Sequence, residues 1–138
     1  MSPPIFLDTA FVYALMNTRD EWHEKAVMWQ VRVVSEMRTL LTSEFVLVEI
    51  ANGLAALHHR NRAVQAIATL RASDYVEIVP ASTRLFDDSF SLYREREDKN
   101  WGMTDCASFV IMRERGLTDA LTMDRHFQQA GFHALLLE

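Results

Sequence analysis

Short apolar runs alternate along this chain with longer stretches of helical periodicity, and this alternation limits the folds open to it more than any other feature. The apolar runs predict five strands, at residues 5–7, 39–42, 75–79, 119–123 and 134–137. Strands that alternate with helices favour a mainly parallel sheet, covered by helices on both faces and joined by right-handed crossovers. The sequence therefore predicts an α/β fold.

Helical spacing of apolar residues predicts helices that start at Phe11 and span about 21–37, 82–97 and 105–115, together with a helical hairpin. In the hairpin, the first helix carries Val46, Leu47, Ile50, Leu54 and Leu57 on one face, and the second, 61–72, carries Val64, Ile67, Ala68 and Leu70. Thr42 or Ser43 and then Thr104 are the candidate N-caps, and Gly116 stands where a helix commonly ends. Trp22 and Trp29 fall on one helical face, a pattern more typical of a core than of an interface.

A length of 138 residues with 49% hydrophobic side chains suits one domain, 1–138, with a continuous core. The first apolar run is only three residues long and is cut off by Asp8, so neither a signal peptide nor a membrane span is expected and the cytoplasm is the predicted location. Cys106 is the only cysteine, which excludes an internal disulfide and argues against structural zinc.

The formal net charge of -5 argues against a protein that coats nucleic acid, because such proteins present a basic face to phosphate. It does not exclude a nuclease. Basic groups at residues 58–62 and 94–96 are available to contact a phosphate backbone around an acidic centre, although each residue taken alone is more typical of a solvated helix end or loop.

Four carboxylates stand at positions where a parallel sheet would gather them. Asp8 ends the first predicted strand, Asp124 ends the fourth, and Asp105 opens the helix that leads into the fourth. Glu49 lies in the apolar stretch 46–51, where a charge is unfavourable without a partner. In an open parallel sheet, ligands bind beyond the carboxyl ends of the strands, so we expect these acids at one edge.

Each acid also has an ordinary explanation. Asp8 and Asp105 suit helix starts, Asp124 suits a turn, and Glu49 can lie on a solvent-facing side of its helix. These ordinary roles do not explain why four acids would lie together, because two unit charges at ~4 Å repel by roughly 4 kcal/mol at an effective dielectric near 20. A divalent cation relieves that repulsion. Oxygen ligands favour Mg²⁺ or Mn²⁺, which activates water for attack on phosphorus.

Four segments resemble PIN domains, and most closely the VapC-like toxins of bacterial and archaeal toxin–antitoxin modules: 5–9 (IFLDT), 42–49 (TSEFVLVE), 104–109 (TDCASF) and 121–127 (LTMDRHF) with Gly131-Phe132. The resemblance implies a three-layer α/β/α sandwich with strand order 3-2-1-4-5. It also implies a ribonuclease that cleaves RNA phosphodiester bonds, with Mg²⁺ or Mn²⁺ held by Asp8, Glu49, Asp105 and Asp124 and with Thr9 and Thr104 in support.

The same resemblance implies a homodimer and a cognate antitoxin with a basic segment, received by a groove that the early helices line. One departure concerns the metal: many members carry a further acid or Asn shortly after the fourth acid, whereas Arg125, His126 and Phe127 follow Asp124 here. A second metal ion is therefore left open. His126 is interpreted as a surface residue at a helix start and stays outside the predicted catalytic set.

Other functions remain as alternatives. A non-toxin RNA-processing nuclease of the PIN type, or a non-catalytic module that binds RNA or a partner, would keep the same fold. A phosphotransferase of the haloacid dehalogenase type needs a second Asp where Ala10 stands, and a receiver domain needs an acidic pair near the N-terminus and a late lysine, whereas the last lysine is Lys99. Cys106 lies among apolar residues and is interpreted as a small core residue instead of a nucleophile.

Overall fold

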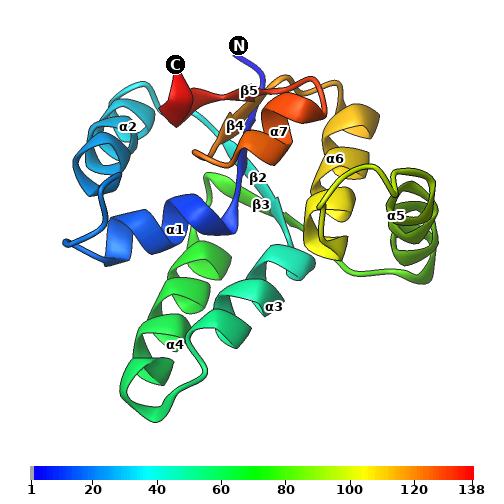
Figure 1. Ribbon diagram of the computed structural model, residues 1–138. Coiled ribbons are helices and arrows are strands. Elements are labelled where there is room, and N and C mark those ends of the chain that lie inside the picture. Colours follow the sequence, from blue (N-terminus) through cyan, green and yellow to red (C-terminus); the bar gives the residue numbers. More distant parts are fainter. Residues whose placement is uncertain (1) are drawn as a thin grey trace.

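The computed structural model describes residues 2–138, which fold as a parallel sheet between layers of helices (Figure 1). The strands are β1 (Ile5–Leu7), β2 (Leu40–Ser43), β3 (Val76–Val79), β4 (Asp119–Leu121) and β5 (His133–Ala134). The helices are α1 (Thr9–Met16), α2 (His23–Ser35), α3 (Glu44–Gly53), α4 (Leu57–Ala72), α5 (Thr83–Glu95), α6 (Met103–Arg115) and α7 (Arg125–Gln129), and a short 3-10 helix, η1 (Leu135–Leu137), follows β5.

The sheet has the order β3-β2-β1-β4-β5, and every neighbouring pair is parallel. β1 lies at its centre, with Phe6 paired to Leu41 of β2 and to Ala120 of β4. Figure 1 shows α1, α2 and α4 on one side of the sheet and α5 and α6 on the other. The predicted three-layer α/β/α sandwich and its strand order are confirmed.

The core follows from the strand sequences. All three residues of β1 are buried, as expected for a central strand that is covered on both faces. On one side, the ring of Phe109 packs edge-on against Phe127 with centroids 5.0 Å apart, and the rings of Trp101 and Phe132 pack against Phe109 in turn. This aromatic cluster fastens α6 and α7 beside the carboxyl end of β4.

Several predicted helix boundaries are wrong. α2 ends at Ser35, so Met37 falls outside the helix; it has a positive φ of 50° and is 70% exposed. In the hairpin, α3 ends at Gly53 and α4 already begins at Leu57, which is 89% exposed and belongs to no core face. Val64 is exposed as well, because Ala63 supplies the buried position of α4. Small residues hid this pattern, since alanine marks an apolar face only weakly.

Two strands are also shorter than predicted by two residues each, β4 and β5. β4 stops at Leu121, where the chain turns so that the hydroxyl of Thr122 accepts a hydrogen bond from the backbone N–H of Asp124. β5 covers only His133–Ala134, and the apolar run that follows it forms η1, which buries Leu136 completely. A short apolar run does not by itself distinguish a strand from a helical turn.

The helix caps agree with the sequence at two of three places. Ser43 accepts a hydrogen bond from the N–H of Val46 and caps α3, and Gly116 ends α6 with φ of 65°. Thr104 is not the cap of α6, because the helix starts one residue earlier, at Met103, with Gly102 as N-cap.

Across residues 2–138 no helix combines the length and the apolar character that a membrane span requires.

Candidate metal centre

Asp8 is the most buried of the predicted acids, with 4% of its surface exposed. It occupies the N-cap position of α1 but makes no capping hydrogen bond. Its carboxylate instead accepts a hydrogen bond of 2.7 Å from the hydroxyl of Thr122, which is fully buried just after β4. The parallel pairing of β1 with β4 brings these two side chains together across 114 positions of sequence. The capping explanation for Asp8 therefore fails.

The surroundings of Asp8 disfavour its charge. Burial raises the pKa of its carboxyl from 3.8 to about 7, although the hydrogen bond from Thr122 acts in the opposite direction. The carboxylates of Asp105, Asp124 and Glu49 each contribute to this rise, in that order, after the larger effect of burial. Asp8 is thus a buried acid within electrostatic reach of three other acids, an arrangement that a cation would stabilise.

Asp105, Asp124 and His126 form the tightest group: one potential ligand atom from each lies within 4.8 Å of the others. Asp105 is the third residue of α6, and its carboxylate accepts a hydrogen bond of 3.0 Å from the N–H of Gly102. Burial raises the pKa of Asp105, and Asp124 raises it further. Asp124 caps α7 by accepting from the N–H of His126, whose Nδ1 lies 3.1 Å from Asp105 and 3.4 Å from Asp124.

Glu49 stands outside this tight group, on the half-buried side of α3. Its position depends on α1: the hydroxyl of Tyr13 donates a hydrogen bond of 2.9 Å to the backbone carbonyl of Glu49. The negative charge of Glu49 also raises the pKa of Tyr13, after the larger effect of burial. Gly53 makes this contact possible, because a Cβ at that position would collide with the Tyr13 hydroxyl.

The two supporting threonines differ. Thr9 follows Asp8 in the sequence and is buried. Its hydroxyl has no hydrogen-bond partner among residues 2–138. Thr104 is the second residue of α6, where its carbonyl accepts a hydrogen bond from the hydroxyl of Ser108. A buried hydroxyl without a partner is costly unless a ligand or water satisfies it.

Two members of the site escaped the sequence-based set. Thr122 belongs to the segment 121–127, but its link to Asp8 depends on strand pairing that the local sequence does not reveal. His126 was interpreted as a surface residue, yet 71% of its side chain is covered because α7 turns it back toward Asp105. Its signal in the sequence was its place two residues after Asp124.

The donor set fits a hard divalent cation. Carboxylate oxygens are the ligand type that Mg²⁺ and Mn²⁺ prefer, and the Thr9 hydroxyl has no hydrogen-bond partner among residues 2–138. The nearby His126 nitrogen adds a ligand type that Mn²⁺ accepts more readily than Mg²⁺ does.

Cys106 is excluded as a nucleophile. It is fully buried on α6, and burial together with the charge of Asp105 raises the pKa of its thiol to about 11. A thiol that stays protonated at neutral pH is a poor nucleophile. The interpretation of Cys106 as a small core residue is confirmed.

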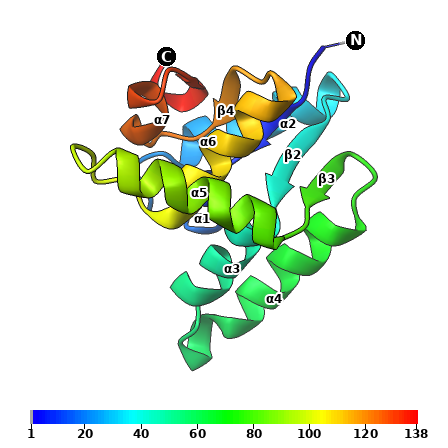
Figure 2. The same cartoon turned by 90° about the vertical axis from the view of Figure 1, so that its right-hand side faces the viewer.

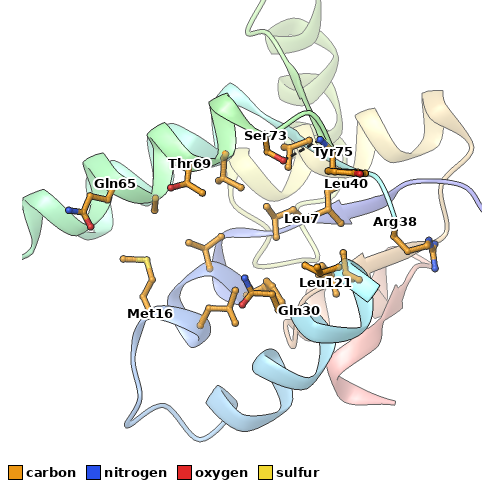
Figure 3. Close-up of a pocket in the computed structure, with 18 of the residues that line it drawn as sticks. Leu7, Met16, Gln30, Arg38, Leu40, Gln65, Thr69, Ser73, Tyr75 and Leu121 are labelled. Carbon is orange, nitrogen blue, oxygen red and sulfur yellow. Dashed lines mark hydrogen bonds between the residues drawn. The ribbon is translucent and has the colours of Figure 1, made fainter. Parts of the chain in front are cut away.

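A concave apolar surface lies away from the acids. An apolar groove of about 620 Å³ opens between α1, α2 and α4. Figure 3 shows Leu7, Leu40 and Leu121 at its floor, Met16 and Gln30 on one wall, and Gln65 and Thr69 on the other. Trp22 and Trp29 do not line it. Both are only partly buried against the core, and Trp22 is the N-cap of α2 and lies outside the helix, so the predicted shared helical face in a buried core is only partly realised.

Comparison with known proteins gives a consistent picture. A family model described as PIN domain matches residues 5–133. The 23S rRNA-specific endonuclease VapC20 of Mycobacterium tuberculosis is 30% identical over 131 residues, which are 93% of this chain and 95% of the relative. The crystal structure of M. tuberculosis VapC20, described as a Sarcin-Ricin loop cleaving toxin, matches with a TM-score of 0.81 at 28% identity and covers 95% of this chain and 98% of that one. FitAcB from Neisseria gonorrhoeae shares the fold, with a TM-score of 0.63 at 20% identity over 93% and 94% of the two chains.

Proposed function

The chain belongs to the PIN-domain family, and from this premise we propose that it is an endoribonuclease that depends on Mg²⁺ or Mn²⁺, acts on RNA in the cytoplasm and serves as the toxin of a VapBC-type toxin–antitoxin module. One observation carries the proposal: a buried aspartate, Asp8, has its pKa raised to about 7 and is surrounded by Asp105, Asp124 and Glu49. Such an arrangement is unfavourable in an empty site and favourable around a cation.

Asp8, Glu49, Asp105 and Asp124 would hold the cation, which supplies an activated water and neutralises charge at the scissile phosphate. The residues of the chain position these ligands. Thr122 fixes the orientation of the Asp8 carboxylate, and Gly102 fixes that of Asp105. A divalent cation in this place also attracts the RNA backbone to a protein whose net charge is -5.

The relative at 30% identity is named a 23S rRNA-specific endonuclease, so we propose a structured ribosomal RNA loop as the substrate. The test uses 23S rRNA and a short hairpin that carries the sarcin–ricin loop, with a hairpin of scrambled loop sequence as control. Cleavage is measured with Mg²⁺, with Mn²⁺ and after addition of EDTA. We expect one dominant cut in the loop, and none with EDTA.

The matched variants are Asp8→Asn and Asp105→Asn, with Asp74→Asn at an exposed position as the control. Each ligand variant should lose more than about 100-fold in cleavage rate, since changing even an outer partner of a metal ligand costs 10–100-fold. Cleavage of unrelated RNA alone would favour an RNA-processing nuclease over a toxin. Binding without cleavage by the metal-loaded wild type would favour the non-catalytic module.

The groove between α1, α2 and α4 supports the antitoxin as partner. Its lining is apolar, and exposed Val34 stands at its rim with 68% of its surface accessible. An apolar helix would cover this surface, and a basic segment beside it would complement the acidic protein. An antitoxin encoded with this chain should inhibit cleavage and co-purify with the wild type but not with Val34→Glu. The homodimer is likewise part of the proposal.

A further inference from the structure

The hairpin formed by α3 and α4 carries a long segment without acids. Residues 50–73 contain no Asp or Glu, although the whole chain has 19 of them and a net charge of -5. The same segment holds two histidines and three arginines, namely His58, His59, Arg60, Arg62 and Arg71. Soluble surfaces usually mix charges of both signs, so a segment of one sign in an acidic protein indicates a negatively charged partner.

Four of these residues gather where α4 begins. His58, His59, Arg60 and Arg62, here called the basic tip, lie in the first two turns of α4, after the loop 54–56. Figure 2 shows this loop as the part of the hairpin farthest from the sheet, and Figure 1 agrees. α3 starts directly after the carboxyl end of β2, so the hairpin projects from the edge of the sheet at which the acids lie.

Glu49 connects the basic tip to the candidate metal centre. Four more residues of α3 follow Glu49, and they extend the hairpin by about 6 Å. A helical nucleic-acid strand advances about 3.4 Å per phosphate, so 6 Å corresponds to about two phosphates. A strand whose scissile phosphate lies at the acids therefore reaches the basic tip within a few nucleotides.

The positive charges of the basic tip are available to an anion. Within residues 2–138 none of its four residues makes a salt bridge, whereas arginines of α5 and α6 are paired with acids. His58, Arg60 and Arg62 are exposed, and the rings of His58 and His59 lie 3.9 Å apart. Arg60 donates one hydrogen bond of 2.9 Å to the carbonyl of Ala55, which leaves its other N–H groups for a ligand.

We propose that the basic tip binds the phosphate backbone of the RNA substrate a few nucleotides from the cut, with Arg60 and Arg62 as the main contacts. The inference rests on the proposed ribonuclease function and adds the surface that holds the substrate. Such a surface is needed because the net charge of the protein repels RNA, and a cation at the acids acts only near the scissile phosphate. Arginine suits the task because its planar guanidinium donates two parallel hydrogen bonds to a phosphate.

An acidic segment of a partner protein is the other polyanion that fits a basic surface. RNA is favoured because the basic tip projects on the side of the acids, where an RNA strand must pass in order to be cut. Arg62 also lines the rim of the apolar groove between α1, α2 and α4, so an occupant of the groove would adjoin the basic tip. The measurements therefore use this chain alone.

Salt dependence measures phosphate contacts directly, because each contact with a single strand adds about 0.7 to the slope of log K against log salt concentration. Arg60→Gln combined with Arg62→Gln should lower this slope by about 1.4 and weaken binding of the sarcin–ricin hairpin at least about tenfold at about 50 mM salt. A fourfold rise in salt should then reduce the advantage of the wild type about sevenfold. Fluorescence anisotropy with a labelled hairpin in EDTA measures binding without cleavage.

Arg71→Gln is the matched control. Arg71 is exposed on the same helix and carries the same charge, but it lies about 16 Å from Arg60 along the axis, toward the start of β3. Its removal should leave the slope unchanged. Arg60→Lys combined with Arg62→Lys keeps both charges and should keep the slope, because lysine also binds phosphate. Arg62→Gln alone leaves the hydrogen bond from Arg60 to Ala55 in place and should lower the slope by about 0.7.

Circular dichroism checks that each variant is folded. Equal losses in Arg71→Gln and in the tip variants would overturn the proposal, because net charge would then explain them. A wild-type slope in the folded glutamine variants would overturn it as well. If poly-glutamate competes for the basic tip more strongly than poly-uridine of equal charge, the surface belongs to an acidic protein instead. Failure of the proposed nuclease would look different: RNA would bind in EDTA with a slope that depends on the basic tip, but Mg²⁺ or Mn²⁺ would cause no cleavage.

Discussion

Replacing the buried carboxyl by a neutral amide, Asp8→Asn, should stabilise the metal-free protein at pH 8 far more than at pH 5. In the folded protein the pKa of Asp8 is raised from 3.8 to about 7, so the folded state binds this proton more tightly than the unfolded state. Stability from this group is therefore complete below pH 3.8 and is lost as the pH rises toward 7. Asparagine carries no charge at any of these pH values.

The size of the effect follows from the two pKa values. The pKa of Asp8 differs between the folded and unfolded states by about three units, and each unit is equivalent to about 1.36 kcal/mol, so the whole difference corresponds to about 4 kcal/mol of stability. About 1.5 kcal/mol of this is already lost at pH 5, because the unfolded carboxyl is ionised there, and about 2.5 kcal/mol is lost between pH 5 and pH 8. For a domain of this size, that difference corresponds to a shift of about 8 °C in Tm.

The assay is thermal unfolding by circular dichroism in EDTA, from pH 5 to pH 8, for the wild type, Asp8→Asn and the exposed control Asp74→Asn. The gap in Tm between Asp8→Asn and the wild type should widen with pH, while the control follows the wild type. Adding Mg²⁺ at pH 8 should raise the Tm of the wild type and leave that of Asp8→Asn almost unchanged. A gap that stays constant with pH, or a variant less stable than the wild type at pH 8, would refute the reasoning.

Three further predictions concern the supports of the site and the core. Thr122→Val deletes the hydrogen bond to Asp8 together with the one that the Thr122 hydroxyl accepts from the N–H of Asp124. The cost should be about 1 kcal/mol larger at pH 8 than at pH 5, because only the Asp8 acceptor becomes charged over this range; urea unfolding at both pH values measures this, and equal costs would contradict it. Gly53→Ala should cost about 1–3 kcal/mol of stability, because the added Cβ collides with the Tyr13 hydroxyl. In a double-mutant cycle, Tyr13→Phe should recover part of that loss. If the stability changes of the two substitutions simply add, the contact plays no part. Leu136→Ala empties a fully buried position in η1 and should cost about 2–5 kcal/mol by urea unfolding; a cost below 1 kcal/mol would mean that the tail is not docked.

The positions of the strands along the chain were predictable from the sequence because hydrophobic periodicity is a local property, whereas their order in the sheet was implied only by the resemblance to PIN domains. Residues 5–7 form a fully buried central strand, and a continuous apolar run is the pattern that such a strand leaves. The ends of elements were less predictable. Leu57 has the right spacing for the face of α3, yet it starts α4, and nothing in its neighbours shows that the chain turns before it. The apolar tail 134–137 suits a strand and a helical turn equally well.

The residues of the candidate site also fall into those that the sequence predicts and those that only the fold reveals. Asp8, Asp105 and Asp124 follow from their places at strand ends and helix starts, and Glu49 from a charge within an apolar stretch. The helix-capping bond expected for Asp8 is absent in the fold, and its real partner, Thr122, lies 114 residues away. His126 could be judged only once α7 had turned it toward Asp105, because exposure of a residue after a strand depends on how the next turn packs.

The sequence alone determined the class of fold, the edge of the sheet at which the acids gather and the chemistry that four carboxylates favour, because periodicity and residue type are carried by neighbouring residues. Only the tertiary structure decided how deeply Asp8 is buried, which side chain holds it, and that the rings of Phe86, Phe90 and Tyr93 remain outside the core. Burial and charge interaction depend on atoms that distant segments bring together. Their consequences, a raised pKa and an uncovered aromatic surface, arise only when the chain has folded.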